Sequence, residues 1–270
     1  MKSELGLETI ARNLSKAIAS NLDRTGIMYR IFYRVKTQHS INKKVLVKNY
    51  IEEGKKLTDL IGIRLTMYFS DDVYLVQQKL MKEPGYDHIS KDEVEIDEFR
   101  PVRCNLTFKF DEEHQKEVQK IIDKDQNIVD SKYEVQLRTV LSEGWHEVEH
   151  DLRYKCKEDW DSHNDLNRNM NGILASLETS EFSMLQVFNE LAYRHYKDKN
   201  VEAMIKTQYR IRFSDVTIEP ELSVYLKDNP EIVKKLHKIT RLEVLKKLMH
   251  SKYSLPVTIN HFIYVLNQSV

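Results

Sequence analysis

The sequence predicts an α/β fold, a mixed sheet of about five strands flanked by helices, with a helical C-terminal region. Two observations predict it. Up to about residue 155, short β-branched and aromatic runs alternate with segments whose apolar residues recur at helical spacing. Beyond residue 160, only helical patterns remain. The sheet is therefore expected in the N-terminal part of the chain.

Each element follows from its own local pattern. The strand-like runs are rich in Val, Ile, Tyr and Phe, and Ser40 and Ser70 stand where N-caps of helices are expected. Residues 86–97 are short, polar and ambiguous. The expected strands are 28–36, 60–69, 105–110 and 132–139, and the expected helices are 3–24, 40–54, 70–81, 111–124, 141–155, 165–200, 230–250 and 258–268.

The same patterns suggest three parts of the chain. Residues 1–160 would form the sheet domain, residues 161–200 a long packing helix, and residues 201–270 a helical C-terminal appendage. The long helix carries apolar residues that are interpreted as its packing face. They are Leu174, Leu177, Phe182, Leu185, Phe188 and Leu191.

Composition excludes several classes of protein. With 42 basic and 42 acidic residues the net charge is zero, which argues against a general nucleic-acid binder. No apolar run approaches the roughly 20 residues that a membrane span requires, so no membrane contact is expected. Cys104 and Cys156 form no paired motif and are interpreted as free thiols. A cytoplasmic protein is the expectation.

A group of basic residues follows the first strand. Arg34 and Lys36 lie two apart, so they point to one face of a strand, and Ser40 and Lys44 lie one turn apart on a helix. Backbone N–H groups at the helix start would add to an anion site. These groups would suit a polyphosphate, and a solvated basic edge is the alternative.

Polar residues also interrupt two strands. Asp59 precedes an apolar strand that contains Arg64, and a buried arginine needs either a carboxylate or a phosphate as partner. Glu134, Gln136 and Arg138 alternate along one face of the last strand. That face would line a cleft, or it would be the wet face of an edge strand.

The helix that follows this strand supports two interpretations. One is the acidic edge of a site for pyrophosphate transfer. The other is a zinc peptidase, because residues 146–150 read H-E-x-x-H, which places His146 and His150 one turn apart. That interpretation needs a third ligand, for which the candidates are His163, Glu178 and Glu181, and none completes a longer zinc-peptidase signature.

Four segments in order resemble the synthetase domain of the RelA/SpoT alarmone synthetases, over about residues 28–157. The family shows R-x-K-x-x-x-S-x-x-x-K, D-x-x-G-x-R, E-x-Q-x-R-T and W-x-x-x-E-H-x-x-x-Y-K. The corresponding residues here are Arg34, Lys36, Ser40 and Lys44; Asp59, Gly62 and Arg64; Glu134, Gln136, Arg138 and Thr139; and Trp145, Glu149, His150, Tyr154 and Lys155. In this comparison His146 and Glu147 become ordinary surface residues.

The resemblance implies a nucleotidyltransferase-like synthetase domain. It also implies transfer of pyrophosphate from ATP to a nucleotide ribose 3′-hydroxyl with release of AMP. It implies that Asp59 and Glu134 are catalytic and hold Mg²⁺, and that Glu134 accepts the hydroxyl proton. The implied ATP-binding residues are Arg34, Lys36, Ser40, Lys44 and Arg64. The implied acceptor-binding residues are Phe99, Arg103, Gln136, Arg138 and His150. The chain lacks the His-Asp hydrolase motif of long bifunctional relatives, so a small single-function member is expected.

One segment departs from the family. Relatives carry P-K-x-x-G-Y-x-S-x-H before the fourth strand, whereas residues 95–103 read EIDEFRPVR. Phe99 stands in place of the tyrosine that stacks on guanine, Arg103 in place of the histidine, and Glu98 in place of the glycine. Three explanations stay open: an acceptor other than GDP or GTP, the 3′ end of tRNA as in toxic relatives, or a nucleotide sensor without turnover. The expected partners are ATP, a nucleotide or tRNA, and a second copy or a partner of the C-terminal region.

Overall fold

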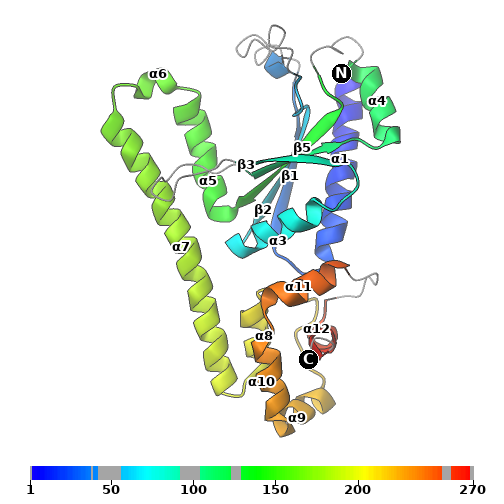
Figure 1. Cartoon of the computed structure of the whole chain (residues 1–270), viewed down its shortest axis with the longest axis vertical. Coiled ribbons are helices and arrows are strands. Elements are labelled where there is room, and N and C mark those ends of the chain that lie inside the picture. The colour runs from blue at the N-terminus through cyan, green and yellow to red at the C-terminus, as the bar shows by residue number, and fades with distance from the viewer. Residues whose placement is uncertain are drawn as a thin grey trace. The chain divides into compact units, whose positions relative to one another are not determined.

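The computed structural model describes residues 2–37, 39–41, 56–91, 104–122, 129–250 and 257–267 (Figure 1). The chain divides into two compact units, each described below by itself. Unit 1 comprises Met1–Ile18, Tyr29–Tyr68 and Val76–Ser176, and unit 2 comprises Ala19–Met28, Phe69–Leu75 and Leu177–Val270. The three parts expected from the sequence stay a prediction.

Unit 1 is built on a mixed five-stranded sheet. Its strands lie in the order β1-β2-β5-β4-β3, with β2 and β5 parallel and the other neighbours antiparallel. Their bounds are β1 Tyr29–Val35, β2 Ile61–Met67, β3 Tyr86–Lys91, β4 Cys104–Lys109 and β5 Lys132–Thr139. The expected fold class is confirmed, and the ambiguous segment that begins at residue 86 forms the edge strand β3.

The two faces of the sheet differ because side chains alternate along each strand. In β5 the buried residues Tyr133, Val135 and Leu137 alternate with partly exposed polar ones. In β2 the residues Ile63 and Leu65 are fully buried. Figure 1 shows α1 (Lys2–Asp23) and α4 (Glu112–Ile122) on one side of the sheet and α5 (Val140–Glu149) on the other. The other helices that contribute residues to this unit are α3 (Ser70–Leu80), α6 (Lys157–Trp160) and α7 (Asn164–Lys197).

Helix α5 starts directly where β5 ends. Thr139 is its N-cap: the Thr139 hydroxyl accepts the Ser142 N–H, and the Ser142 hydroxyl accepts the Thr139 N–H. This capping box fixes the strand-to-helix turn without a loop. The helix that the sequence predicts over 141–155 is interrupted, because a π-helical segment replaces the α-helix at His150–Tyr154. Such segments are frequently found at functional sites.

Unit 2 is helical. It contains α8 (Val201–Tyr209), α9 (Pro220–Asp228), α10 (Pro230–Lys238), α11 (Arg241–His250) and α12 (Ile259–Asn267). The single helix expected over 230–250 is two helices, because Ile239 is extended and Thr240 caps α11 through its contacts with Glu243. None of the helices in the described ranges is long and apolar enough to cross a membrane.

Buried charges tie the start of α3 to the C-terminal helices within unit 2. Asp72 is fully buried and accepts hydrogen bonds from both terminal nitrogens of Arg241. Arg210 donates to Asp71 at 2.5 Å. The aromatic ring of Phe69 meets that of Phe188 edge to face, with 5.5 Å between centroids. Cys104 and Cys156 are free thiols, as expected.

Candidate active site on the polar face of the sheet

The polar residues singled out in the sequence lie in register on one face of the sheet. Across the strands, Arg34 pairs with Gly62, and Gly62 pairs with Glu134. One step along, Phe32 pairs with Arg64, which pairs with Gln136. Residues directly opposite one another in adjacent strands point to the same face. The sheet therefore brings Arg34, Arg64, Glu134 and Gln136 to one surface, on the side of α5.

A lysine and an aspartate meet at one end of this face. Lys36 follows β1 and Asp59 precedes β2, and the antiparallel pairing of these strands places the two ends side by side. The Lys36 ammonium forms an ion pair with Asp59, and both side chains are largely buried, at 15% and 17% exposed. Lys36, expected at the ATP phosphates, is held beside the expected metal ligand.

Glu134 lies close to the same segment, just before the beginning of β2. The Thr58 hydroxyl donates to Glu134 Oε1 at 3.3 Å, so Glu134 contacts the residue that precedes Asp59. Among the described residues, no three His, Cys, Asp or Glu side chains form a metal cluster. Two carboxylates completed by substrate phosphates are a donor set that suits Mg²⁺. Asp59 and Glu134 therefore fit this ion by their chemistry.

Arg64 has two carboxylate partners on α5. Its guanidinium donates to Glu143 at 2.6 Å, forms an ion pair with Glu147, and contacts Gln136 Oε1 at 3.4 Å. Burial opposes the charge of Arg64, but the two carboxylates outweigh burial and raise its pKa. The sequence comparison suggested that Glu147 is an ordinary surface residue. Its ion pair with Arg64 shows instead that it takes part in this face. The missed signal was the spacing of Glu143 and Glu147, one turn apart on the same helix face.

The residues of the helix after β5 that match the family pattern divide into two groups. Trp145 is buried, and its indole N–H donates to the Met170 carbonyl at 3.1 Å. Arg153 lies over the Trp145 ring, contacts Glu149 at 3.4 Å and donates to Asn171 at 3.0 Å. This group fastens the π-helical segment to the beginning of α7.

The second group is exposed. The rings of His150 and Tyr154 stack with centroids 5.7 Å apart, and Lys157 lies over the Tyr154 ring. Lys155 donates to Asp151 at 2.5 Å. The interruption by the π-helical segment places His150 and Tyr154 in stacking contact. An exposed aromatic pair beside lysines is a surface on which a base can stack.

The zinc-peptidase alternative is not supported. Glu147, the glutamate that such a site needs beside its metal, is paired with Arg64. The ring of His146 packs edge to face on Trp145, with centroids 5.5 Å apart. Of the described residues, no third ligand joins His146 and His150, and this holds for His163, Glu178 and Glu181.

Several expected site residues are not placed with the others. Lys44, Phe99 and Arg103 lie outside the described residues. The Ser40 hydroxyl lies 3.0 Å from that of Thr37 and is exposed. Arg138 is half-buried on the same face of β5 as Glu134 and pairs with Thr66 in the strand register. The structure therefore brings Arg34, Lys36, Asp59, Arg64, Glu134 and Gln136 together, and it leaves Lys44, Phe99 and Arg103 undescribed.

The fold and this face define an α/β domain that offers cations and carboxylates to a phosphorylated ligand. Residues 33–159, a little under half of the chain, match the family model described as "Region found in RelA / SpoT proteins". No protein of curated function matches the chain.

Solved structures are similar over a larger part of the chain. Small alarmone synthetase 1 from Bacillus subtilis, bound to its product pppGpp, has 18% identity and a TM-score of 0.49, covering 71% of this chain and 95% of that one. Small alarmone synthetase 2 from Bacillus subtilis has 19% identity and a TM-score of 0.48, covering 70% and 95%. A GTP pyrophosphokinase family protein from Streptococcus pneumoniae has 19% identity and a TM-score of 0.48, covering 66% and 87%. Because these identities are below 20% and the TM-scores are below 0.5, the match to the family model is the stronger indication of kinship.

Proposed function

We propose that the chain is an ATP-dependent pyrophosphokinase, which transfers pyrophosphate to the ribose 3′-hydroxyl of a GDP- or GTP-type nucleotide and releases AMP. The observation that carries the proposal is the alignment of Arg34, Arg64 and Glu134 on one face of a RelA/SpoT-type sheet. Three strands that are far apart in the sequence supply cations and a carboxylate to one surface. A polyphosphate and its metal ion need this combination.

The proposed roles follow from position. Arg34, Lys36 and Arg64 bind the ATP phosphates, together with Ser40 and Lys44 from the segment after β1. Asp59 and Glu134 hold Mg²⁺, which would neutralise phosphate charge when bound. Lys36 is already paired with Asp59, so it can share its charge between this carboxylate and an arriving phosphate.

Glu134 is the proposed base. It accepts the proton of the acceptor 3′-hydroxyl, whose oxygen forms a bond to the β-phosphorus of ATP. The bond from that phosphorus to the oxygen bridging to the α-phosphate breaks, and AMP leaves with the electron pair. The Thr58 hydroxyl, which donates to Glu134 Oε1, orients the carboxylate for this step.

The acceptor is proposed to lie toward β4, β3 and the exposed end of α5. Gln136, Arg138 and His150 would contact it, with Phe99 and Arg103 from the segment before β4. The stacked pair of His150 and Tyr154 supports a ring-stacking role at this end. The altered segment 95–103 makes the 3′ end of tRNA the alternative acceptor to test.

The test is transfer of label from ATP. Purified protein is incubated with γ-³²P-ATP and Mg²⁺, and GDP, GTP, ADP or bulk tRNA is added separately. Label on GDP or GTP that disappears with the Glu134→Gln variant is the expected result. Label on tRNA alone would contradict a nucleotide acceptor. Absence of transfer to all four, with ATP still bound, would favour a sensor and overturn the proposed activity.

A further inference from the structure

The aromatic ring of Phe32 is exposed on the face of the sheet that carries the proposed ATP site, although Phe32 is not part of the sequence pattern shared with the family. The residue is 56% exposed. Strand pairing sets it directly opposite Arg64, which in turn lies opposite Gln136. A single exposed apolar residue is common on protein surfaces. Phe32 differs because its neighbours on this face are charged residues that the proposed function assigns to a nucleotide.

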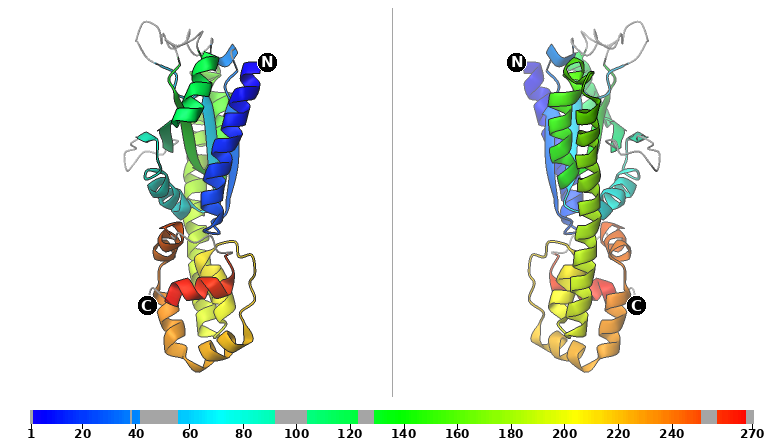
Figure 2. Two further views of the ribbon diagram at one scale, coloured as in Figure 1. Left: turned by 90° about the vertical axis from the view of Figure 1, so that its right-hand side faces the viewer. Right: turned by 90° about the vertical axis from the view of Figure 1, so that its left-hand side faces the viewer.

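The opposite face of β1 lies toward the N-terminal helix. Ile31 and Tyr33 alternate with Phe32 along the strand and are half-buried. The Tyr33 hydroxyl accepts a hydrogen bond from Arg12 Nε of α1 at 3.4 Å. Helix α1 runs alongside the strands in both views of Figure 2. Phe32 therefore points away from α1, toward the side of the sheet on which α5 lies.

The two arginines that flank Phe32 on β1 are directed elsewhere. The Arg34 side chain extends toward β2, because its Cγ and Nε lie 3.7 and 3.8 Å from the position that a Cβ on Gly62 would occupy. Gly62 has no side chain, so Arg34 passes over it and across the sheet. The Arg30 guanidinium lies over the Tyr68 ring, 5.8 Å from its centroid. The Phe32 ring is thus left exposed between two cations.

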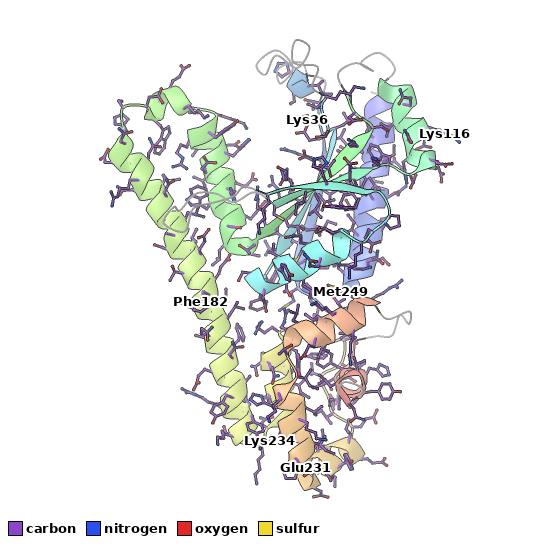
Figure 3. All side chains as sticks on the ribbon, in the orientation of Figure 1. Lys36, Lys116, Phe182, Glu231, Lys234 and Met249 are labelled. Atoms are coloured by element: carbon purple, nitrogen blue, oxygen red, sulfur yellow. The ribbon has the colours of Figure 1, made fainter. Side chains whose placement is uncertain are left out.

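The order of side chains along β1 matches the order of groups in ATP. Lys36, labelled in Figure 3, and its ion-pair partner Asp59 lie at one end, where the phosphates and Mg²⁺ are proposed to bind. Arg34 comes next, and Phe32 lies about 13 Å from Lys36 along the strand, at roughly 3.3 Å per residue. In ATP, the α-phosphate and the ribose separate the base from the β- and γ-phosphates. Phosphates held at Lys36 and Arg34 would therefore bring the base to Phe32.

We propose that the Phe32 ring stacks on the adenine base of ATP. This role rests on the proposed function, because the base belongs to its ATP donor. The donor is the partner of Phe32 because β1 is the edge strand beside β2, whereas the acceptor is proposed to lie beyond β5, toward β4 and β3. Stacking on an aromatic side chain strengthens binding of a base without reading its hydrogen-bonding groups. Phe32 therefore adds affinity for the base and leaves the phosphates to the cations.

Two probes separate binding of the base from binding of the phosphates. Isothermal titration calorimetry of the full chain with Mg²⁺ compares a non-hydrolysable ATP analogue with inorganic tripolyphosphate, which lacks base and ribose. Phe32→Ala is expected to weaken binding of the ATP analogue about tenfold, within the range for loss of one stacked base, and to leave tripolyphosphate binding unchanged. Phe32→Tyr keeps an aromatic ring and is expected to bind both probes like wild type.

Phe182 supplies the matched control. The packing face expected from the sequence is corrected at Phe182 and Leu191, which are 62% and 38% exposed, whereas Leu174 and Ala192 are each 1% exposed. Phe182 is labelled on α7 in Figure 3, and none of the proposed ATP-binding residues belongs to that helix. Phe182→Ala removes an equally exposed ring and is expected to leave both affinities at their wild-type values.

Three other results would overturn the role of Phe32. Unchanged affinity of Phe32→Ala for the ATP analogue would place the base elsewhere. An equal loss for both probes would show that Phe32 supports the phosphate-binding residues and not the base. Wild type that binds neither probe would overturn the proposed ATP site itself, so that failure is distinguishable from the failure of Phe32 alone.

The transfer assay distinguishes the donor base from the acceptor base. In Phe32→Ala, the KM for ATP is expected to rise about tenfold, while kcat and the KM for GDP or GTP stay at wild-type values, because stacking on the base is the same in the ground state and the transition state. A rise in the KM of the acceptor alone would show that Phe32 stacks on the acceptor base and would overturn its assignment to ATP.

Discussion

Arg64 Nη1 donates to Glu143 Oε1 at 2.6 Å. This contact joins strand β2 to helix α5, which follows the last strand, β5. The Glu143 side chain is only 18% exposed, so this ion pair is shielded from water. Glu147, the other carboxylate partner, is 57% exposed. Glu143 therefore fixes the guanidinium, and Glu147 is the partner that a phosphate can more readily replace.

The first prediction concerns the shape of the Arg64 side chain. Arg64→Lys keeps the positive charge but loses the planar fork that reaches a carboxylate and a phosphate together. We expect the affinity for a non-hydrolysable ATP analogue to fall about tenfold, which corresponds to about 1.4 kcal/mol. Isothermal titration calorimetry measures this. Glu147→Gln is the control and is expected to bind the analogue at least as tightly as wild type. Unchanged affinity in Arg64→Lys would remove Arg64 from the ATP site.

Local alternation made much of this face predictable. The pattern of residues 132–139 predicts that Glu134, Gln136 and Arg138 share one face, and the burial of β5 alternates accordingly. The same argument gives the apolar face of β2. Both follow from the two-residue period of a strand, which needs no knowledge of the neighbouring elements.

Contacts between elements were not predictable in the same way. Nothing local to β2 indicates that Arg64 pairs with Glu143, because that contact depends on the parallel pairing of β2 with β5 and on the capped turn at Thr139. The edge strand β3 was ambiguous because its pattern is short and polar, and it is defined by pairing with β4. The interruption at His150 likewise has no signal in helical propensity.

The second prediction tests the two carboxylates. Asp59→Asn and Glu134→Gln are isosteric and remove one negative charge each. We expect transfer of label to fall at least about a hundredfold in each variant, the range for loss of a positioned acid–base group. Thermal unfolding should stay close to wild type. Near-normal turnover in either variant would contradict the two-carboxylate assignment.

A matched control separates the carboxylates from general charge effects. Asp165→Asn removes one negative charge from an exposed residue of the same unit, away from the polar face. It should retain wild-type turnover. Since removal of the Asp59 charge also releases Lys36, the Asp59→Asn variant should bind ATP in the absence of Mg²⁺ no more weakly than wild type, while losing turnover. A loss of ATP binding as large as the loss of turnover would make Asp59 structural.

The third prediction concerns pH. Burial lowers the pKa of His237, whose ring stacks on Tyr196 with centroids 4.6 Å apart and whose Nδ1 lies 2.9 Å from Gln208 Oε1. The folded state therefore binds the His237 proton more weakly than the unfolded state, where the pKa is about 6.5. The stability from the neutral ring is present above that value and is lost as pH falls below it.

Urea unfolding at pH 7.5 and at pH 5.5 measures this dependence. The free energy of unfolding should fall less on acidification in His237→Gln than in wild type. His163→Gln replaces an exposed histidine and should keep the wild-type dependence. Equal slopes in His237→Gln and wild type would show that His237 is not protonated on unfolding in this range.

The last prediction compares two arginine–carboxylate pairs that differ in burial. Arg241 is 8% exposed and meets the fully buried Asp72, whereas Arg194 is 70% exposed and meets the exposed Glu190. Arg241→Met leaves a buried carboxylate without its main counter-charge, and we expect it to lower the free energy of unfolding by about 3–5 kcal/mol. Arg194→Met should lower it by at most about 1 kcal/mol, because water already screens that pair.

A double variant distinguishes the loss of the pair from the burial of an unpaired charge. In Asp72→Asn/Arg241→Met the buried carboxylate is neutral, so part of the stability lost in Arg241→Met should return. Denaturant unfolding of the full chain measures the free energy of unfolding of wild type, Arg241→Met, Arg194→Met and the double variant. If the double variant were as unstable as Arg241→Met, the damage would come from packing around Arg241, including its bond to the Tyr209 carbonyl at 2.6 Å. Recovery would instead show that the charge of Asp72 makes the start of α3 depend on Arg241 in α11.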